Sequence, residues 1–294
     1  MPEGHSVHRL AKQFTSVFAG ERLAVSSPQG RFAAGAEQLD GATLLSALAH
    51  GKQLFLRFDN DRVLRVHLGL YGAWSFGGDA TFRGASSIGA PRRIGESEQP
   101  SGNGDAHGGY AGPPEPVGAV RVRLVSAHGW ADLRGPTACE VITPAEEAAV
   151  RTRLGPDPLQ PRSDGGLFAR RILSSISPVG VQLMNQAVIA GIGNVYRAEV
   201  LFLQGISPWR PGRQLSEDEV AGIWADTVRL MKDGVGEGRI ITTTAEARGG
   251  RPKASAPHYV YKRTGEPCRR CGAPVLTAEM AARNVYWCPQ CQAD

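Results

Sequence analysis

The sequence predicts an α+β fold in which an antiparallel β part precedes a helical part. Residues 21–74 and 119–133 contain short runs of alternating apolar and polar side chains, the periodicity of half-buried strands. From Thr143 onward the apolar residues instead follow a helical spacing. The chain of 294 residues ends in a cluster of cysteines. Together these observations predict two domains, the second of which ends in a metal-binding tail.

A helix is expected close to the N-terminus, ending near Gly20, because apolar residues follow Ser6 at helical spacing: Val7, Leu10, Phe14, Val17 and Phe18. Its dipole would favour a neutral amine at Pro2 and a charged carboxylate at Glu3. If Met1 is removed, Pro2 becomes a secondary amine that can attack electrophilic carbon and form an iminium ion. Glu3 could supply and remove the protons. An ordinary exposed terminus explains the same residues without chemistry.

Strands are expected at 22–25, 52–58, 63–68, 119–125 and 130–133. The second and third of these form a hairpin around the turn at 59–61. Residues 77–118 interrupt the pattern, since they hold 11 Gly and 5 Pro with almost no apolar periodicity. We therefore expect a disordered insertion there.

Helices are expected from Thr143, over 166–175, 181–190 and 194–203, and from the N-cap Ser216 to about Gly234. Glycine and proline at 155–161 indicate an interdomain linker. The predicted layout is a catalytic domain over 1–145, a linker over 146–162, a helical domain over 163–255 and a metal-binding tail over 256–294.

The strongest single signal is the spacing of four cysteines in the tail, which are Cys268, Cys271, Cys288 and Cys291. Two Cys-x2-Cys pairs separated by 16 residues fit a tetrahedral four-thiolate zinc site. Four protein ligands leave no position for water, so the metal is expected to be structural. The fifth cysteine, Cys139, has apolar neighbours and is expected to be a small buried hydrophobe.

Charge favours a polyanionic partner, since the net charge is +5 and the pI is about 9.1. Basic side chains cluster before and within the tail: Arg248, Arg251, Lys253, Lys262, Arg263, Arg269 and Arg270. His258, Tyr259 and Tyr261 lie among them, and the mixture suits phosphate contacts with apolar docking. A solvated charged face is the alternative. The absence of any long apolar run predicts a cytosolic protein.

Two helices joined by a glycine turn are expected around Gly191, Ile192 and Gly193. Two glycines allow close backbone approach, and the free amides of the following helix N-terminus suit a phosphate. Asn194 could cap that helix and bond a phosphate oxygen. A plain helical hairpin with an Asn cap remains the alternative.

Four features now occur in order: Met-Pro-Glu-Gly at the start, Gly51-Lys52-Gln53-Leu54-Phe55 on a hairpin, Gly191-Ile192-Gly193-Asn194, and the four-Cys tail. This combination resembles the formamidopyrimidine-DNA glycosylase and endonuclease VIII (Fpg/Nei) family of bifunctional base-excision repair enzymes. The resemblance covers nearly the whole chain except 77–118. It implies an N-terminal antiparallel β-sandwich with flanking helices, then a helix–two-turn–helix domain and a zinc finger with one structural Zn2+.

The resemblance also implies roles. Pro2 would attack the sugar C1′ and form a Schiff base, Glu3 would move protons, and Lys52 and Arg283 would contact the lesion phosphates. Asn194 and Lys262 would bind DNA, which would lie in a basic cleft between the domains. Residues 67–74 look like the intercalation loop of the endonuclease VIII branch, with Leu70 and Tyr71 as an apolar wedge. Alternatively, Leu70 and Tyr71 are core residues at the end of a strand.

Departures from the family pattern occur at His5, Ser6, Gly180 and Asn185, where the family usually has Pro, an acid, Lys and Asp. Gly4 and the Leu70–Tyr71 pair favour the endonuclease VIII branch and therefore oxidised pyrimidines and abasic sites. A monomer acting at the nucleoid is expected. The competing hypotheses are a non-catalytic damage-binding protein that retains Met1, and a tautomerase that uses Pro2 as a general base.

Overall fold

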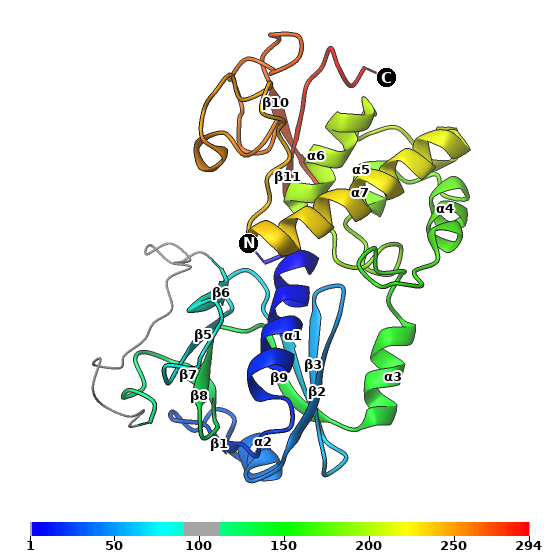
Figure 1. Ribbon diagram of the computed structural model, residues 1–294. Helices are drawn as coiled ribbons and strands as arrows, with labels where there is room; N and C mark the ends of the chain where they lie inside the picture. The colour runs from blue at the N-terminus through cyan, green and yellow to red at the C-terminus, as the bar shows by residue number, and fades with distance from the viewer. Residues whose placement is uncertain (1, 91–111, 294) are drawn as a thin grey trace. The chain divides into compact units, whose positions relative to one another are not determined.

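The computed structural model describes residues 2–90 and 112–293 (Figure 1). The chain divides into two compact units. Unit 1 comprises Met1–Pro2 and Ser6–Thr152, and unit 2 comprises Glu3–His5 and Arg153–Asp294. Within the described residues no helix is long and apolar enough to cross a membrane.

Unit 1 is an antiparallel β-sandwich, as expected. One sheet has the strand order β1 (Ala24–Ser26), β7 (Val120–Val125), β8 (Gly129–Arg134), β5 (Ala73–Gly78) and β6 (Ser87–Gly89). The other has the order β2 (Leu44–His50), β3 (Gln53–Phe58), β4 (Val63–His67) and β9 (Ala138–Ile142). All neighbouring strands pair antiparallel, and β3 and β4 form the expected hairpin.

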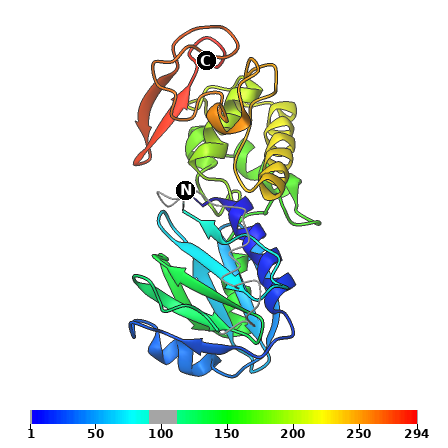
Figure 2. The same ribbon diagram turned by 60° about the vertical axis from the view of Figure 1, so that its left-hand side comes forward.

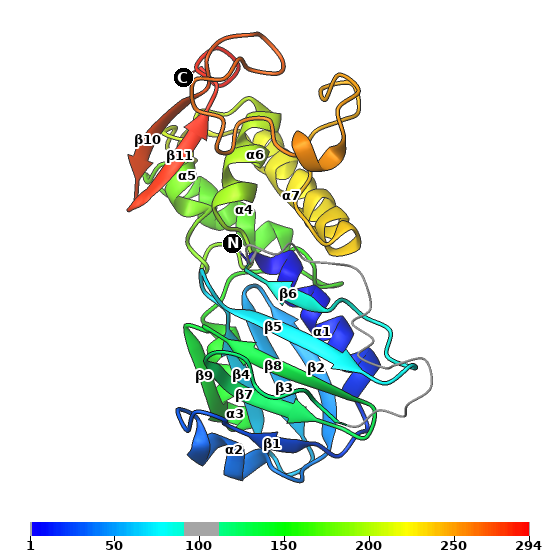
Figure 3. The same ribbon diagram turned by 90° about the vertical axis from the view of Figure 1, so that its left-hand side faces the viewer.

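The helix α1 (Gly4–Phe18) runs along the sandwich beside the edges of both sheets (Figures 1 and 3). Its apolar stripe enters the core, where the Phe14 ring meets Trp74 at 4.8 Å and Phe76 at 5.2 Å between centroids. Two shorter helices complete the unit, α2 (Ala33–Leu39) and α3 (Pro144–Thr152). Thr143 and Glu146 cap α3 reciprocally, which confirms the predicted helix start.

The predicted insertion at 77–118 is wrong for its first part. Gly77 and Gly78 end β5, and β6 pairs with β5. Phe82 and Ile88 are buried in the sandwich core and anchor this part of the range, although the sequence between them has no strand periodicity. Residues 91–111 of this range lie outside the described residues.

Unit 2 begins with helices. They are α4 (Gly165–Leu173), α5 (Val179–Gln182), α6 (Asn194–Gln204) and α7 (Glu217–Glu237), with short 3-10 turns at Gly212–Gln214 and Lys253–Ser255. Ser216 and Glu219 form a capping box at the start of α7, as its Ser-x-x-Glu sequence predicts. The chain then forms the hairpin β10 (Leu276–Met280) and β11 (Arg283–Trp287), which projects from the helices (Figure 2).

The helix predicted over 181–190 is wrong, since α5 ends at Gln182 and turns follow it. Side chains replace the helical hydrogen bonds there. Asn185 Oδ1 accepts from the Ala187 N–H at 2.9 Å. Gln186 accepts from the Gly191 N–H at 3.0 Å and donates to the Ile192 carbonyl at 2.9 Å. These local bonds compete with helix formation and shape the glycine turn before α6.

The boundary between the units lies at Thr152, within the range 146–162 that the sequence indicates as linker. The end of α3 therefore occupies the first part of that range and belongs to unit 1. The tail packs on the helices of unit 2, with Phe202 of α6 stacked on Tyr259 at 5.0 Å between ring centroids.

Candidate active site and zinc centre

Glu3 lies at the N-terminus of α6. Its carboxylate accepts hydrogen bonds from the backbone N–H groups of Gly193 at 2.7 Å, Val195 at 2.8 Å and Tyr196 at 3.4 Å. Glu3 is fully buried. The first amides of a helix and its dipole favour an acceptor with negative charge, so this arrangement fixes the orientation of the Glu3 carboxyl group. Pro2 is bonded directly to Glu3.

Two glycines make this contact possible. A Cβ on Gly193 would lie 2.4 Å from Glu3 Cδ. A Cβ on Gly4 would lie 2.9 Å from the Gly191 Cα, and the Gly4 N–H donates to the Gly191 carbonyl at 2.8 Å. The N-terminal strip therefore docks backbone to backbone on the glycine turn, which explains both Gly4 and Gly193.

Asn194 connects α6 to strand β11 of the finger hairpin. Its Nδ2 donates to the Asn284 carbonyl at 2.9 Å, and its Oδ1 accepts from Arg197. Arg197 also donates to the Asn284 carbonyl at 3.0 Å. Both side chains thus fix the backbone beside Arg283, which is exposed at the start of β11. The sequence predicted Asn194 as a phosphate ligand but did not predict this structural contact.

Arg197 is a site residue that sequence reasoning missed. Its side chain is fully buried, and its Nε and Nη1 have no hydrogen-bond partner among the described residues. Burial first, and then the charge of the nearby Arg283, lower the pKa of Arg197 to about 10, while Glu3 acts to raise it. A buried cation with unused donors next to a second arginine forms an anion-attracting centre.

Glu199 is a second missed residue. Its carboxylate accepts from the backbone N–H groups of Tyr259 at 2.8 Å, Val260 at 2.9 Å and Tyr261 at 2.8 Å, and from Thr242 Oγ1. It therefore holds the segment that leads to Lys262, which is exposed. A charged residue among the apolar positions of 194–202 was the signal that could have found it, because buried carboxylates need such partners.

Unit 1 contains the other predicted residues. Lys52 lies in the two-residue turn between β2 and β3, and its neighbour Gln53 pairs with His67 across β3 and β4. The pKa of His67 is lowered by burial first, then by the charges of Lys52 and Arg65. The imidazole beside Lys52 is therefore biased to its neutral form.

Leu70 and Tyr71 lie in the loop between β4 and β5. They are 47% and 81% exposed, which excludes the strand-end core alternative for these two side chains. A bond from the Gly72 N–H to the Leu68 carbonyl at 2.9 Å closes the loop, and Gly69 has φ +65°. The loop thus presents two apolar side chains from a fixed base.

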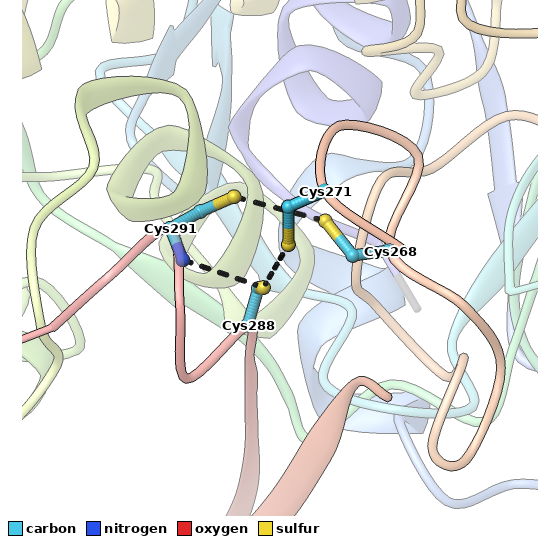
Figure 4. Close-up of side chains that lie close together, drawn as sticks. All are labelled: Cys268, Cys271, Cys288 and Cys291. Atoms are coloured by element: carbon cyan, nitrogen blue, oxygen red, sulfur yellow. Dashed lines mark hydrogen bonds between the residues drawn. The ribbon is translucent and has the colours of Figure 1, made fainter. Parts of the chain in front are cut away.

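The four predicted cysteines converge in the tail (Figure 4). All four Sγ atoms lie within 4.8 Å of one another, and two pairs are separated by 3.9 Å and 3.4 Å. Sulfurs around one zinc at about 2.3 Å are about 3.8 Å apart, so the set fits a single tetrahedral ion. The remaining thiol, Cys139, is partly buried, and burial raises its pKa to about 12, which keeps it protonated and unreactive.

The structure shows the surroundings of the four residues that depart from the family pattern. His5 is buried with its ring edge-on to Tyr196 at 5.5 Å between centroids, and Ser6 is buried in α1. Gly180 lies against the hairpin, where a Cβ would be 2.8 Å from Met280 Sδ. Asn185 forms the turn bond described above. His5, Gly180 and Asn185 therefore shape packing or a turn.

Three family models match the chain in succession. They are the formamidopyrimidine-DNA glycosylase N-terminal domain over residues 1–109, its H2TH domain over 154–246, and the zinc finger found in FPG and IleRS over 265–293. Together with the N-terminal Pro-Glu and the four-thiol centre, these matches define the class. The chain belongs to the Fpg/Nei family of DNA glycosylases with AP-lyase activity, and its finger holds one structural zinc.

Among individual relatives, "Endonuclease 8 1" of Mycobacterium tuberculosis is 45% identical over 99% of this chain and 100% of its own length. "Probable endonuclease 8 2" of Streptomyces coelicolor is 30% identical over 100% of this chain and 94% of its own length. Lactococcus lactis Fpg in complex with a DNA containing N7-benzyl-Fapy-dG has a TM-score of 0.75 at 22% identity, covering 100% of both chains. That likeness confirms the α+β fold.

Proposed function

We propose that the protein is a bifunctional DNA glycosylase and AP lyase in which Pro2 is the nucleophile. The observation that carries this proposal is the Glu3 carboxylate, fixed by the amides of α6 one peptide bond from Pro2. A carboxylate held in one position beside an N-terminal secondary amine is what proton transfer during amine attack requires. Relatives named endonuclease 8 support an enzyme that cuts DNA strands.

In the proposed reaction, base removal comes first and strand cleavage follows. The Pro2 nitrogen bonds to C1′ while the C1′–N glycosidic bond breaks and its electron pair leaves with the base. The nitrogen then loses its proton, its lone pair forms the C=N bond of the iminium ion as the C1′–O4′ bond breaks, and O4′ takes up a proton. Removal of a C2′ proton expels the 3′ phosphate, and removal of a C4′ proton expels the 5′ phosphate. Glu3 accepts and returns the protons, and water finally hydrolyses the iminium ion.

Phosphate contacts are assigned to Lys52 in unit 1 and to Asn194, Arg283 and Lys262 in unit 2. Asn194 and Arg197 both bond the carbonyl of Asn284, the residue after Arg283, so the backbone beside Arg283 is fixed before DNA binds. Leu70 and Tyr71 are assigned as the wedge that fills the stack when the damaged nucleotide is extruded, at a cost of about a few kcal/mol. Their exposure supports this role.

Oxidised pyrimidines and abasic sites are the proposed substrates. The endonuclease 8 names of two relatives support this assignment. Duplexes containing 5-hydroxyuracil, thymine glycol, 8-oxoguanine or an abasic site should be cleaved by protein with Met1 removed. We expect cleavage at the two pyrimidine lesions and the abasic site to exceed that at 8-oxoguanine. A preference for 8-oxoguanine would contradict the lesion class but not the lyase chemistry.

A non-catalytic damage-binding protein on the same scaffold is the second candidate. It would retain Met1 and bind an abasic-site duplex without cutting it, so intact mass and a cleavage gel on one preparation separate the two functions. We further propose that the enzyme acts as a monomer on chromosomal DNA at the nucleoid. Size-exclusion chromatography with light scattering tests the monomer.

A further inference from the structure

A pocket of about 540 Å³ opens in unit 2 beside the first cysteine pair. Residues of the segment 244–251, Tyr259, Arg263 and the segment 267–270 line it. Five arginines line it, namely Arg248, Arg251, Arg263, Arg269 and Arg270, against one carboxylate, Glu246. We call this cavity the arginine pocket.

Two of these arginines are committed to the fold. Arg270 donates to the carbonyls of Phe202 at 3.2 Å and Leu203 at 3.3 Å, and its guanidinium lies 4.6 Å from the Phe202 ring centroid. Arg263 is buried, pairs with Glu266 at 2.9 Å and donates to the Pro267 carbonyl at 2.9 Å. Their positions are therefore fixed. Their charges add to the positive potential of the pocket, but most of their N–H groups already bind the protein.

The other three arginines keep donors for a ligand. Arg269 uses Nε on the His258 carbonyl at 3.0 Å, and no bond of its Nη atoms occurs among the described residues. Arg248 uses Nη1 on Thr243. Arg251 is exposed, and its side chain forms no hydrogen bond with the described residues. Its backbone N–H donates to the Arg248 carbonyl at 3.1 Å. Three partly free guanidinium forks thus line one cavity.

The positive charges disturb one another. Arg251, Arg263 and Arg269 line the same cavity, so three like charges lie close together there. Such crowding of like charges is unfavourable in the ligand-free protein and is relieved when an anion enters. Arginine forks match the oxygens of phosphate in a bidentate geometry, which favours phosphate over a monatomic anion such as chloride.

We propose that the arginine pocket is a phosphate-binding site separate from the Pro2–Glu3 site. Glu3 binds the N-terminal amides of α6, whereas Arg270 binds carbonyls near its C-terminal end. A helix of 11 residues spans about 16 Å, so the two sites are at least one nucleotide step apart. The ligand is a phosphate group, supplied either by the backbone of a bound nucleic acid or by a free polyphosphate.

The test uses the zinc-loaded full chain and the double variant Arg251→Gln with Arg269→Gln. Arg251→Gln alone is the second variant, because it removes no side-chain bond from the fold. Arg213→Gln, an exposed arginine of the same unit outside the pocket, is the matched control. Titration with pyrophosphate by calorimetry and with a long undamaged DNA duplex at several salt concentrations gives two independent readouts. Neither depends on Pro2, so failure of the catalytic proposal leaves them unchanged.

If DNA supplies the phosphate, the double variant lowers the slope of log K against log salt by about 0.9 for each DNA phosphate that it no longer neutralises, and Arg213→Gln does not. If a free polyphosphate supplies it, pyrophosphate binds the wild type and the control, the double variant binds it at least tenfold more weakly, and the salt slope is unchanged. The proposal is overturned if both variants and the control match the wild type in both titrations.

Discussion

At the residue scale, the orientation of Glu3 depends on a glycine that lies 190 positions away in the sequence. A Cβ on Gly193 would meet the Glu3 carboxylate at 2.4 Å, so Gly193→Ala displaces the carboxylate from the α6 amides. General acid–base catalysis contributes about 10²–10⁴-fold to a rate. We therefore expect the rate of abasic-site cleavage to decrease by a factor in that range. Gel-based single-turnover rates measure it.

The matched control is Gly236→Ala in α7, where a Cβ has nothing within 4 Å. Alanine in a helix is favoured over glycine by about 1 kcal/mol, so this variant should be slightly more stable and fully active. Equal cleavage rates for Gly193→Ala, Gly236→Ala and wild type would show that Glu3 needs no fixed position.

The pair of His128 and Asp79 gives a pH-dependent prediction. Their Nδ1 and Oδ2 atoms are 2.8 Å apart. The Asp79 hydrogen bond raises the pKa of His128, while bonds from Thr81 and then His128 lower the pKa of Asp79 to about 2. Because the pKa of His128 is raised on folding, its contribution to stability is complete below the unfolded value of about 6.5 and disappears as pH rises through the folded value.

NMR titration of the imidazole checks this pair. His128 should titrate above 6.5 in the wild type and move back toward 6.5 in Asp79→Asn. An unshifted His128 in the wild type, or an unchanged pKa in the variant, would contradict the ion pair.

Some residues of the site can be predicted from the sequence, and others cannot. Cys268 and its three partners follow from spacing alone, because a tetrahedral ion fixes the order and separation of its ligands along the chain. Arg197 and Glu199 are harder to predict, since the backbone groups that they bind, at Asn284 and at 259–261, lie far away in the sequence. A charged residue among apolar positions marks each of them locally, but only the fold identifies these partners.

At the element scale, the finger hairpin has an unusual turn. Ala281 and Ala282 both adopt positive φ, at 50° and 58°, between Met280 and Arg283, which are paired. A two-residue turn of this kind favours Asn-Gly, and the left-handed region costs other residues about 1–2 kcal/mol each. The strain lies immediately before Arg283, the proposed phosphate contact.

Replacing the turn by Ala281→Asn together with Ala282→Gly should therefore stabilise the finger by about 1–2 kcal/mol. Zinc retention against a chelator and the midpoint of thermal unfolding measure the effect. The reverse-order variant, Ala281→Gly with Ala282→Asn, controls for composition and should gain less. No gain in either variant would show that the turn is unstrained.

Elements with strong local signals were predictable. The capped starts of α3 and α7 and the alternation of β3 and β4 agree with the structure. The helix predicted over 181–190 does not form, because the side chains of Asn185 and Gln186 accept hydrogen bonds from backbone N–H groups of this segment. β6 was missed because three residues of an edge strand give too short a pattern within a glycine-rich range.

At the scale of the whole molecule, the fold divides into units with separate cores, one inside the sandwich and others in the helical and finger parts. The finger core is small and includes Cys268 and Cys288 themselves, so zinc is required to order it. Chelation should abolish binding of an abasic-site duplex while the far-UV β signal of the sandwich persists. Readdition of Zn2+ should restore binding, and binding that survives complete zinc removal would contradict a structural role.

We propose that Pro2 forms the covalent intermediate. Borohydride reduction during reaction with an abasic-site oligonucleotide converts the iminium ion into a stable amine, and mass spectrometry of the N-terminal peptide locates it. We predict one adduct, on Pro2, in protein from which Met1 has been removed, and strongly reduced trapping in Pro2→Gly and Pro2→Thr. An adduct on Lys52 or another lysine, equal trapping in both variants, or no adduct with Met1 removed would contradict this account.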